Sequence, residues 1–177
     1  MATKNKEGGG GAVLLFLLAT AFIYPTLPSP QVKPKGVLDY HLLRFWGASP
    51  EAPRSVIEHE VTLAADAHGI DHRLFRAVIK VESGGNPRAL SPVGARGLAQ
   101  VMPANSRRCG LRHSDQLWDI VSNVRCGAKI LSEEISNYNG DIVKALQAYN
   151  GGPRCVGRCS ESIQYSAKVL ATARRLG

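Results

Sequence analysis

The stretch DHRLFRAVIKVESGG, residues 71–85, decides how the chain is interpreted. Asp71 is a residue type that commonly caps the start of a helix. Phe75, Val78 and Ile79 lie seven, four and three positions before Glu82, and these spacings place Glu82 on the apolar face of a helix. The stretch therefore predicts a helix from Asp71 to about Ser83, with a carboxyl group on its buried face.

A carboxyl group in that position is suited to acid catalysis. Burial disfavours the charged form, and the C-terminal end of a helix dipole does the same, so both raise the pKa of Glu82. A carboxylic acid that stays protonated near neutral pH can act as a general acid. The competing interpretation is a structural glutamate, bonded to the local backbone or to an arginine.

Two further polar side chains occur in apolar surroundings. Gln100 follows Gly97-Leu98-Ala99, where an amide suggests a hydrogen-bonding group that points inward. Tyr149 shares a helical face with Ala145 and Leu146, so its ring should be buried and its hydroxyl needs a partner. Each is more often a satisfied core group, but three such groups next to glycine turns favour a substrate cleft.

The rest of residues 54–177 has helical periodicity and few alternating β patterns. The fold class we expect is mainly α, a helical domain with irregular packing. A loop rich in glycine and proline should follow Ser83. Further helices are predicted over Arg54–His68, in a short segment after Pro103, over Ser122–Tyr138, over Ile142–Asn150 with Asp141 as cap, and over Glu161–Leu176.

The N-terminal region points to export. No charged residue occurs from Gly8 to Val32, and Lys4 and Lys6 precede this segment, which predicts that residues 1–7 stay in the cytoplasm. Residues 8–27 are either a signal peptide or an uncleaved membrane anchor. Both interpretations export the domain, which would be periplasmic, anchored in the inner membrane or secreted, or held in a virion membrane if a phage encodes it.

Residues 28–53 are predicted to form a proline-rich linker. Residues 25–53 contain six of the ten prolines in the chain, a density that argues against regular helix. The apolar patch Val37–Trp46 within the linker either packs on the domain or lies at the membrane surface.

The four cysteines of an exported domain suggest two disulfides. Of the three pairings, we favour Cys155–Cys159, which closes a small loop, together with Cys109–Cys126. A four-cysteine zinc site is the alternative, although the spacing suits it poorly.

The charge and composition of the chain limit the class of partner that it can bind. Lys and Arg outnumber Asp and Glu by 22 to 14, and a net charge of +8 favours an anionic partner such as a wall polymer, lipid headgroups or nucleic acid. Dispersed arginines and only 6 % aromatic residues argue against nucleic acid. His59-Glu60 lacks the second histidine of a zinc-protease helix and is interpreted as surface, so we expect no metal and no cofactor.

Several ordered motifs resemble the catalytic core of lytic transglycosylases with a goose-lysozyme-like fold, the soluble lytic transglycosylase (SLT) family. The resemblance covers about residues 54–177. It is carried by ESGGNP at 82–87, SPVGARGLAQVMP at 91–103, Asn123-Val124 with Gly127, AYNGGP at 148–153, and Glu161 with Tyr165. The chain departs from the family at Ala99, where methionine is usual, and a smaller residue there would enlarge the space near Gln100.

The resemblance implies cleavage of the β-1,4 bond between N-acetylmuramic acid and N-acetylglucosamine in peptidoglycan, without metal or nucleotide. It makes Glu82 the sole acid/base, which protonates the leaving oxygen and then takes a proton from the muramic C6 hydroxyl to leave a 1,6-anhydro product. From Ser83 to Asn105 there is no Asp or Glu to act as a second carboxylate. The residues implied to bind sugar are Ser91, Gln100, Met102, Tyr149, Asn150 and Glu161, and Tyr149 is also expected to steady Glu82 through its hydroxyl.

Two other functions remain open at this point. One is a lysozyme-type hydrolase on the same fold, with water as nucleophile. The other is a non-catalytic wall-binding scaffold subunit. A small exported transglycosylase would suit local opening of the cell wall, for a secretion or conjugation machine or for phage entry.

Overall fold

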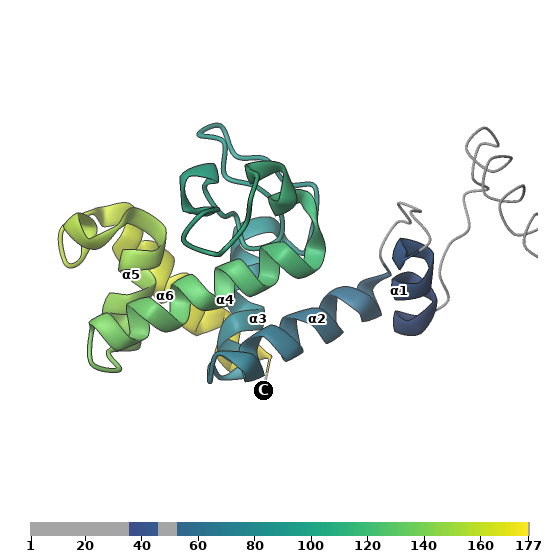
Figure 1. Cartoon of the computed structure of the whole chain (residues 1–177). Helices are drawn as coiled ribbons and strands as arrows, with labels where there is room; N and C mark the ends of the chain where they lie inside the picture. The colour runs from purple at the N-terminus through teal and green to yellow at the C-terminus, as the bar shows by residue number, and fades with distance from the viewer. Residues whose placement is uncertain (1–35, 46–52, 177) are drawn as a thin grey trace, which may run out of the picture.

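The computed structural model describes residues 36–45 and 53–176, and in these ranges the chain is helical (Figure 1). Antiparallel pairing in this part is limited to two isolated bridges, Leu90 with Arg96 and Arg96 with Val101. The elements in chain order are α1 (Val37–Phe45), α2 (Arg54–Ala67), α3 (His72–Ser83), the 3-10 helices η1 (Pro103–Asn105) and η2 (Ser114–Trp118), α4 (Ile120–Asn137), α5 (Ile142–Gly151), the 3-10 helix η3 (Pro153–Cys155) and α6 (Ser160–Arg175). The predicted fold class is confirmed, and the predicted helices end within two residues of the observed ones.

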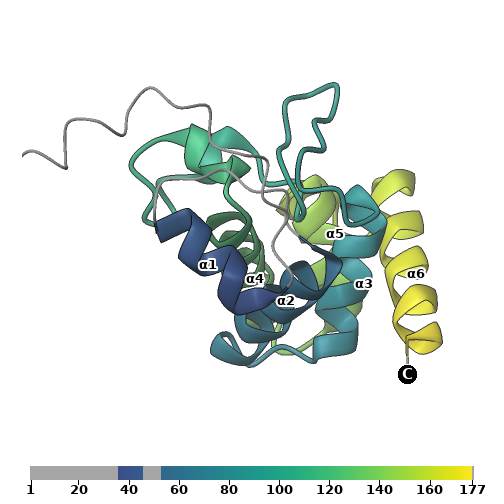
Figure 2. The same ribbon diagram turned by 90° about the vertical axis from the view of Figure 1, so that its right-hand side faces the viewer.

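Local chemistry explains where α3 begins and ends. The Asp71 side chain accepts a hydrogen bond of 3.0 Å from the backbone N–H of Leu74, which satisfies a free donor of the first turn. The helix ends at Gly84, whose φ of 65° is the left-handed conformation that glycine adopts without strain. Between these ends, Phe75 and Val78 are fully buried. Helix α3 lies beside α6, with α2 packed on its other flank (Figure 2).

One core holds the described helices together. Its largest fully buried side chains come from the five helices α2 to α6, from the 3-10 helix η2 and from the loop before η1. These side chains include Val56, Phe75, Leu98, Leu117, Leu131, Leu146 and Val169.

Helix α1 corrects the prediction that residues 28–53 form a linker throughout. Val37–Phe45 forms a helix. No proline falls between Pro34 and Pro50, so none interrupts the hydrogen bonds of this helix. Tyr40 is buried in the core, and His41 Nε2 lies 2.9 Å from Oε1 of Glu60 on α2. Of the two interpretations of this patch, packing on the domain is therefore correct for one face of the helix. The surface interpretation of Glu60 is wrong, since this carboxylate is buried beneath α1.

Both predicted disulfides are present. Cys109 is bonded to Cys126, which ties the segment after η1 to α4, and Cys155 is bonded to Cys159 between α5 and α6. With all four thiols paired, the alternative zinc site has no ligands.

No helix within 36–45 or 53–176 has the length and apolar character needed to cross a membrane. The predicted cytoplasmic segment 1–7 and the predicted signal or anchor 8–27 lie outside the described residues.

Candidate active site

Glu82 occupies the last turn of α3 and contacts α6. The hydroxyl of Tyr165 on α6 donates a hydrogen bond of 2.7 Å to Glu82 Oε1. Tyr165 is itself buried, with Val169 one turn further along the same face of α6. The carboxyl group predicted on the buried face of α3 is therefore partly buried and held by a single side-chain donor.

Burial raises the pKa of Glu82 from its ordinary value of 4.5 to about 7. Two groups on α6 act in the opposite direction and lower this pKa: the Tyr165 hydroxyl, which bonds the carboxylate, and the positive charge of Lys168. Burial also raises the pKa of both Tyr149 and Tyr165 well above 10, and the nearby Glu82 charge adds to this. At neutral pH Glu82 is poised between its two protonation states, and the tyrosines remain neutral hydrogen-bond donors.

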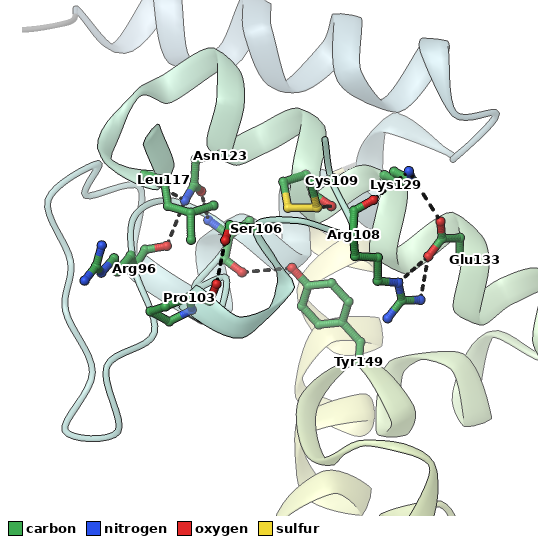
Figure 3. The surroundings of a disulfide bond; sticks show 12 residues. Arg96, Pro103, Ser106, Arg108, Cys109, Leu117, Asn123, Lys129, Glu133 and Tyr149 are labelled. Carbon is green, nitrogen blue, oxygen red and sulfur yellow. Dashed lines mark hydrogen bonds and ion pairs between the residues drawn. A yellow bond between two sulfur atoms is a disulfide. The ribbon is translucent and has the colours of Figure 1, made fainter. Parts of the chain in front are cut away.

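Tyr149 does not steady Glu82 through its hydroxyl as expected. That hydroxyl donates a 2.8 Å hydrogen bond to the carbonyl oxygen of Ala99 (Figure 3). Gly127 of α4 makes room for this contact. A Cβ atom at Gly127 would lie 3.1 Å from the Tyr149 hydroxyl and 2.4 Å from the Ala99 Cβ. Helix α4 therefore packs closely against the small Ala99 side chain at Gly127.

Tyr165 is the functional residue for which the sequence analysis gave no role. Tyr165 has buried neighbours at helical spacing. They are Ser162 three positions before it, Ser166 one position after it and Val169 four positions after it. This pattern indicates that Tyr165 faces the core. It does not tell which of two buried tyrosines reaches Glu82, because that depends on how α3, α5 and α6 pack.

Gln100 and Ser91 shape the loop that follows Glu82. Gln100 Nε2 donates to the carbonyl oxygens of Ala89 (3.1 Å) and Gly97 (2.9 Å), and its backbone has a left-handed φ of 46°. Ser91 Oγ accepts a 2.9 Å hydrogen bond from the Ala95 N–H. Both predicted site residues are satisfied within the loop, which they hold in a defined shape.

The side chain of Asn123, on α4, hydrogen-bonds the backbone of the same loop. Its Nδ2 donates to the carbonyl oxygens of Arg96 and Leu117, both at 2.8 Å, and its Oδ1 accepts from the Ala99 N–H at 2.8 Å (Figure 3). A Cβ atom at Gly97 would lie 2.4 Å from Asn123 Nδ2, so this position requires glycine. The resemblance drew attention to Asn123, and the structure gives the reason in its three backbone partners.

The remaining predicted site residues are exposed. Met102 follows the loop just before η1, Asn150 lies near the end of α5, and Glu161 is in the first turn of α6, one turn before Tyr165. Asn150 Oδ1 accepts a 2.8 Å hydrogen bond from Ser162 Oγ. The Cys155–Cys159 disulfide packs on the adjacent Gly151, where a Cβ atom would lie 2.7 Å from the Cys155 Cβ. Asn150 is thus held by α6 through Ser162, the residue that follows Glu161.

A cavity of about 420 Å³ lies elsewhere, between α2 and α3. Arg76, Ile79 and Lys80 of α3 line it, and Glu82 is not among its lining residues. Gly84, Gly85 and Pro87, at the start of the loop that follows Glu82, also line the cavity. In the described part of the chain, no cluster of three or more His, Cys, Asp and Glu side chains is arranged to hold a metal ion.

The arrangement of a helix-terminal glutamate, a tyrosine donor and a hydrogen-bonded loop agrees with a comparison to known families. The family described as Transglycosylase SLT domain matches residues 61–169. The chain belongs to the transglycosylase SLT domain family. The matched range of this SLT domain includes Glu82, Tyr149 and Tyr165.

Individual relatives of the SLT domain come from phages and bacteria. The transglycosylase of Enterobacteria phage PRD1 is 37 % identical over 107 residues, which are 60 % of this chain and 39 % of the phage protein. The soluble lytic murein transglycosylase of Escherichia coli K12 is 32 % identical over 84 residues, 44 % of this chain and 13 % of that protein. An inactive mutant of the lytic transglycosylase Slt from Pseudomonas aeruginosa superposes with a TM-score of 0.61 at 28 % identity, over 79 % of this chain and 27 % of that one. The SLT chain thus matches two fifths or less of the length of these relatives.

Proposed function

We propose that this SLT-domain chain is a peptidoglycan lytic transglycosylase in which Glu82 is the sole acid/base. The observation that carries the proposal is the Glu82 carboxyl group, partly buried, bonded by Tyr165, and with its pKa raised to about 7. A carboxyl group whose pKa lies near the working pH can be protonated at neutral pH and can also release its proton readily.

In the first step, Glu82 transfers its proton to the oxygen that links N-acetylmuramic acid to N-acetylglucosamine. The bond between this oxygen and muramic C1 breaks, and positive charge develops at C1. The Glu82 carboxylate that remains is stabilised by the Tyr165 hydroxyl and by the charge of Lys168, both of which favour the ionised form.

In the second step, the C6 hydroxyl of the same muramic residue attacks C1. Glu82 takes the hydroxyl proton, which restores its acid form and leaves a 1,6-anhydro ring. An internal nucleophile is already close to C1, so the reaction needs neither a second carboxylate nor a bound water. The absence of Asp and Glu from Ser83 to Asn105 agrees with such a one-carboxylate reaction.

The other site residues are proposed to bind the glycan strand. Gln100 and Ser91 would act mainly by holding the loop, because their polar atoms bond loop backbone. Met102, Asn150 and Glu161 are exposed and would contact sugar directly. Tyr149 would support the subsite through the Ala99 carbonyl.

In the cell, we propose that the chain is exported and opens the wall locally, for a secretion or conjugation machine or for phage entry. Residues 8–27 would act as signal peptide or membrane anchor ahead of the 28–53 region and the catalytic domain at 54–177. Similarity to the PRD1 transglycosylase supports the phage interpretation.

Digestion of purified sacculi with the wild type, Glu82→Gln and Glu58→Gln tests the proposal. Glu58→Gln is the control, because Glu58 lies on α2 and lines the separate cavity. We expect the wild type and Glu58→Gln to release anhydro-muropeptides, and Glu82→Gln to lose about 10²–10⁴-fold in rate. Products heavier by one water would show a lysozyme-type hydrolase. Sacculus binding without release by any of the three proteins would show a non-catalytic wall-binding subunit.

A further inference from the structure

Helix α1 presents two different faces. One face packs on the domain through buried Tyr40, through His41 paired with Glu60 of α2, and through Arg44 paired with Asp119 at the start of α4. The Arg44 guanidinium also lies over the Tyr40 ring, 5.8 Å from its centre. These contacts come from two different helices, so they fix the orientation of α1 relative to the domain.

A second face of α1, next to the one that packs on the domain, is apolar and exposed. Leu38, Leu42 and Phe45 are 72 %, 49 % and 82 % exposed, and their spacing of four and then three positions aligns them along one side of the helix. A row of large apolar side chains exposed to solvent is typical of an interaction site. Because a helix turns by about 100° per residue, the row lies about a third of a turn around α1 from the residues that pack on the domain.

The neighbouring sequence indicates which partner this face meets. Nine residues, 28–36, separate the uncharged segment 8–27 from α1, and a chain of that length reaches at most about 30 Å. Lys33 and Lys35 fall in this interval, where they would attract anionic lipid headgroups. In sequence order, a segment proposed to enter the membrane, two lysines and then a helix with an exposed apolar face are the pattern of an interfacial helix.

We propose that α1 lies on the bilayer surface through Leu38, Leu42 and Phe45. The inference rests on the proposed membrane attachment of residues 8–27. Because α1 is fixed to α2 and α4, its contact with lipid also sets the orientation of the whole domain. Helix α5 lies at the end of the molecule opposite to α1, and we expect this end to be held away from the bilayer (Figure 1).

Photo-crosslinking of the unmodified full chain tests the inference. The chain is reconstituted in vesicles of phosphatidylglycerol and phosphatidylethanolamine that contain a lipid with a photoreactive acyl chain. We expect crosslinks in residues 8–27 and also at Leu38 and Leu42, with none at Leu90 and Val93, which are exposed apolar residues on the active-site loop. Crosslinks confined to residues 8–27 would overturn the role of α1 and leave membrane attachment intact. Crosslinks in neither region would overturn both.

Tryptophan fluorescence gives a second, matched measurement. In a full chain with Trp46→Phe and Trp118→Phe, the probes are Leu42→Trp on α1 and Val143→Trp on α5, two positions of similar exposure at 49 % and 44 %. Lipids that carry a nitroxide near the headgroup should remove most of the fluorescence at position 42 and little of it at 143. Equal quenching at the two positions would contradict the proposed orientation.

Discussion

The hydroxyl of Tyr165 donates a 2.7 Å hydrogen bond to Oε1 of Glu82, across 83 positions of sequence. Burial raises the pKa of this carboxyl group and the hydrogen bond lowers it, so Tyr165 holds the pKa below the value that burial alone would give. The protonation of Glu82, the proposed catalytic acid on α3, is therefore influenced from α6.

Tyr165→Phe should shift the pH profile of cleavage upward. The first step needs protonated Glu82, so we expect the wild-type rate to fall as pH rises through about 7. Removing the hydroxyl destabilises the carboxylate and raises the Glu82 pKa further, which moves this fall to higher pH. Rates of muropeptide release between pH 5 and 9 measure the shift.

Tyr138→Phe is the control for this prediction, because Tyr138 is at the C-terminal end of α4 and bonds through its backbone. Its profile should match the wild type. A downward shift with Tyr165→Phe would show that the hydroxyl does not favour the carboxylate.

Glu82→Gln should make the free energy of unfolding less dependent on pH. Because the folded-state pKa of Glu82 is raised from 4.5 to about 7, the folded chain holds a proton that the unfolded chain releases between these values. Folding is therefore destabilised progressively as pH rises through this window, by up to ~3 kcal/mol above pH 7.

The glutamine has no charge to desolvate, so the variant should be more stable than the wild type at pH 8 and similar to it at pH 4.5. Urea unfolding at both pH values measures the difference. An equal difference at both would mean that Glu82 titrates normally in the folded protein.

Tyr149→Phe should weaken substrate binding and leave the pH profile in place. The change leaves the buried Ala99 carbonyl without its donor, at a cost of about 1–3 kcal/mol in the free energy of unfolding. The loop from Gly97 to Gln100 then loses support, so KM for glycan strands should rise while the alkaline fall stays near pH 7. A profile shifted like that of Tyr165→Phe would assign the same role to both tyrosines.

The two disulfides should differ in their contribution to stability. The Cys109–Cys126 bond closes a longer loop than Cys155–Cys159, with sequence separations of 17 and 4. By loop-closure entropy, the double serine variants should lose ~3 and ~2 kcal/mol respectively. Denaturant unfolding measures both losses. The variant at 155 and 159 should also bind glycan less tightly, because its disulfide packs against Gly151, next to Asn150.

Local sequence features predicted most of the helices and the buried face on which Glu82 lies. Asp71 and Asp141 cap the helices that follow them, and the spacing of Phe75, Val78 and Ile79 before Glu82 fixed the face on which the acid lies. These features depend on residues within two turns of one another, and tertiary packing leaves them unchanged.

The errors concern contacts between distant segments. The prolines of residues 25–53 suggested a linker, but Val37–Phe45 forms a helix that is stabilised by Glu60 and Asp119 of other elements. Tyr149 and Tyr165 both occupy buried helix faces, and only the packing of α3 against α6 assigns the Glu82 contact to Tyr165. Helical periodicity tells that a side chain is inside, and it does not identify the neighbour.

The hydrogen bonds of Asn123 also imply an order of folding. Arg96 and Ala99 lie 27 and 24 positions before Asn123, so their backbone groups gain these partners only after α4 has formed and the intervening chain has closed. Contacts that close long loops form late, because the chain loses conformational entropy on closure before the new contacts can stabilise the closed loop. We therefore expect the loop wall of the candidate active site to form after α4, and before the Glu82–Tyr165 contact, which spans 83 positions and joins α3 to α6.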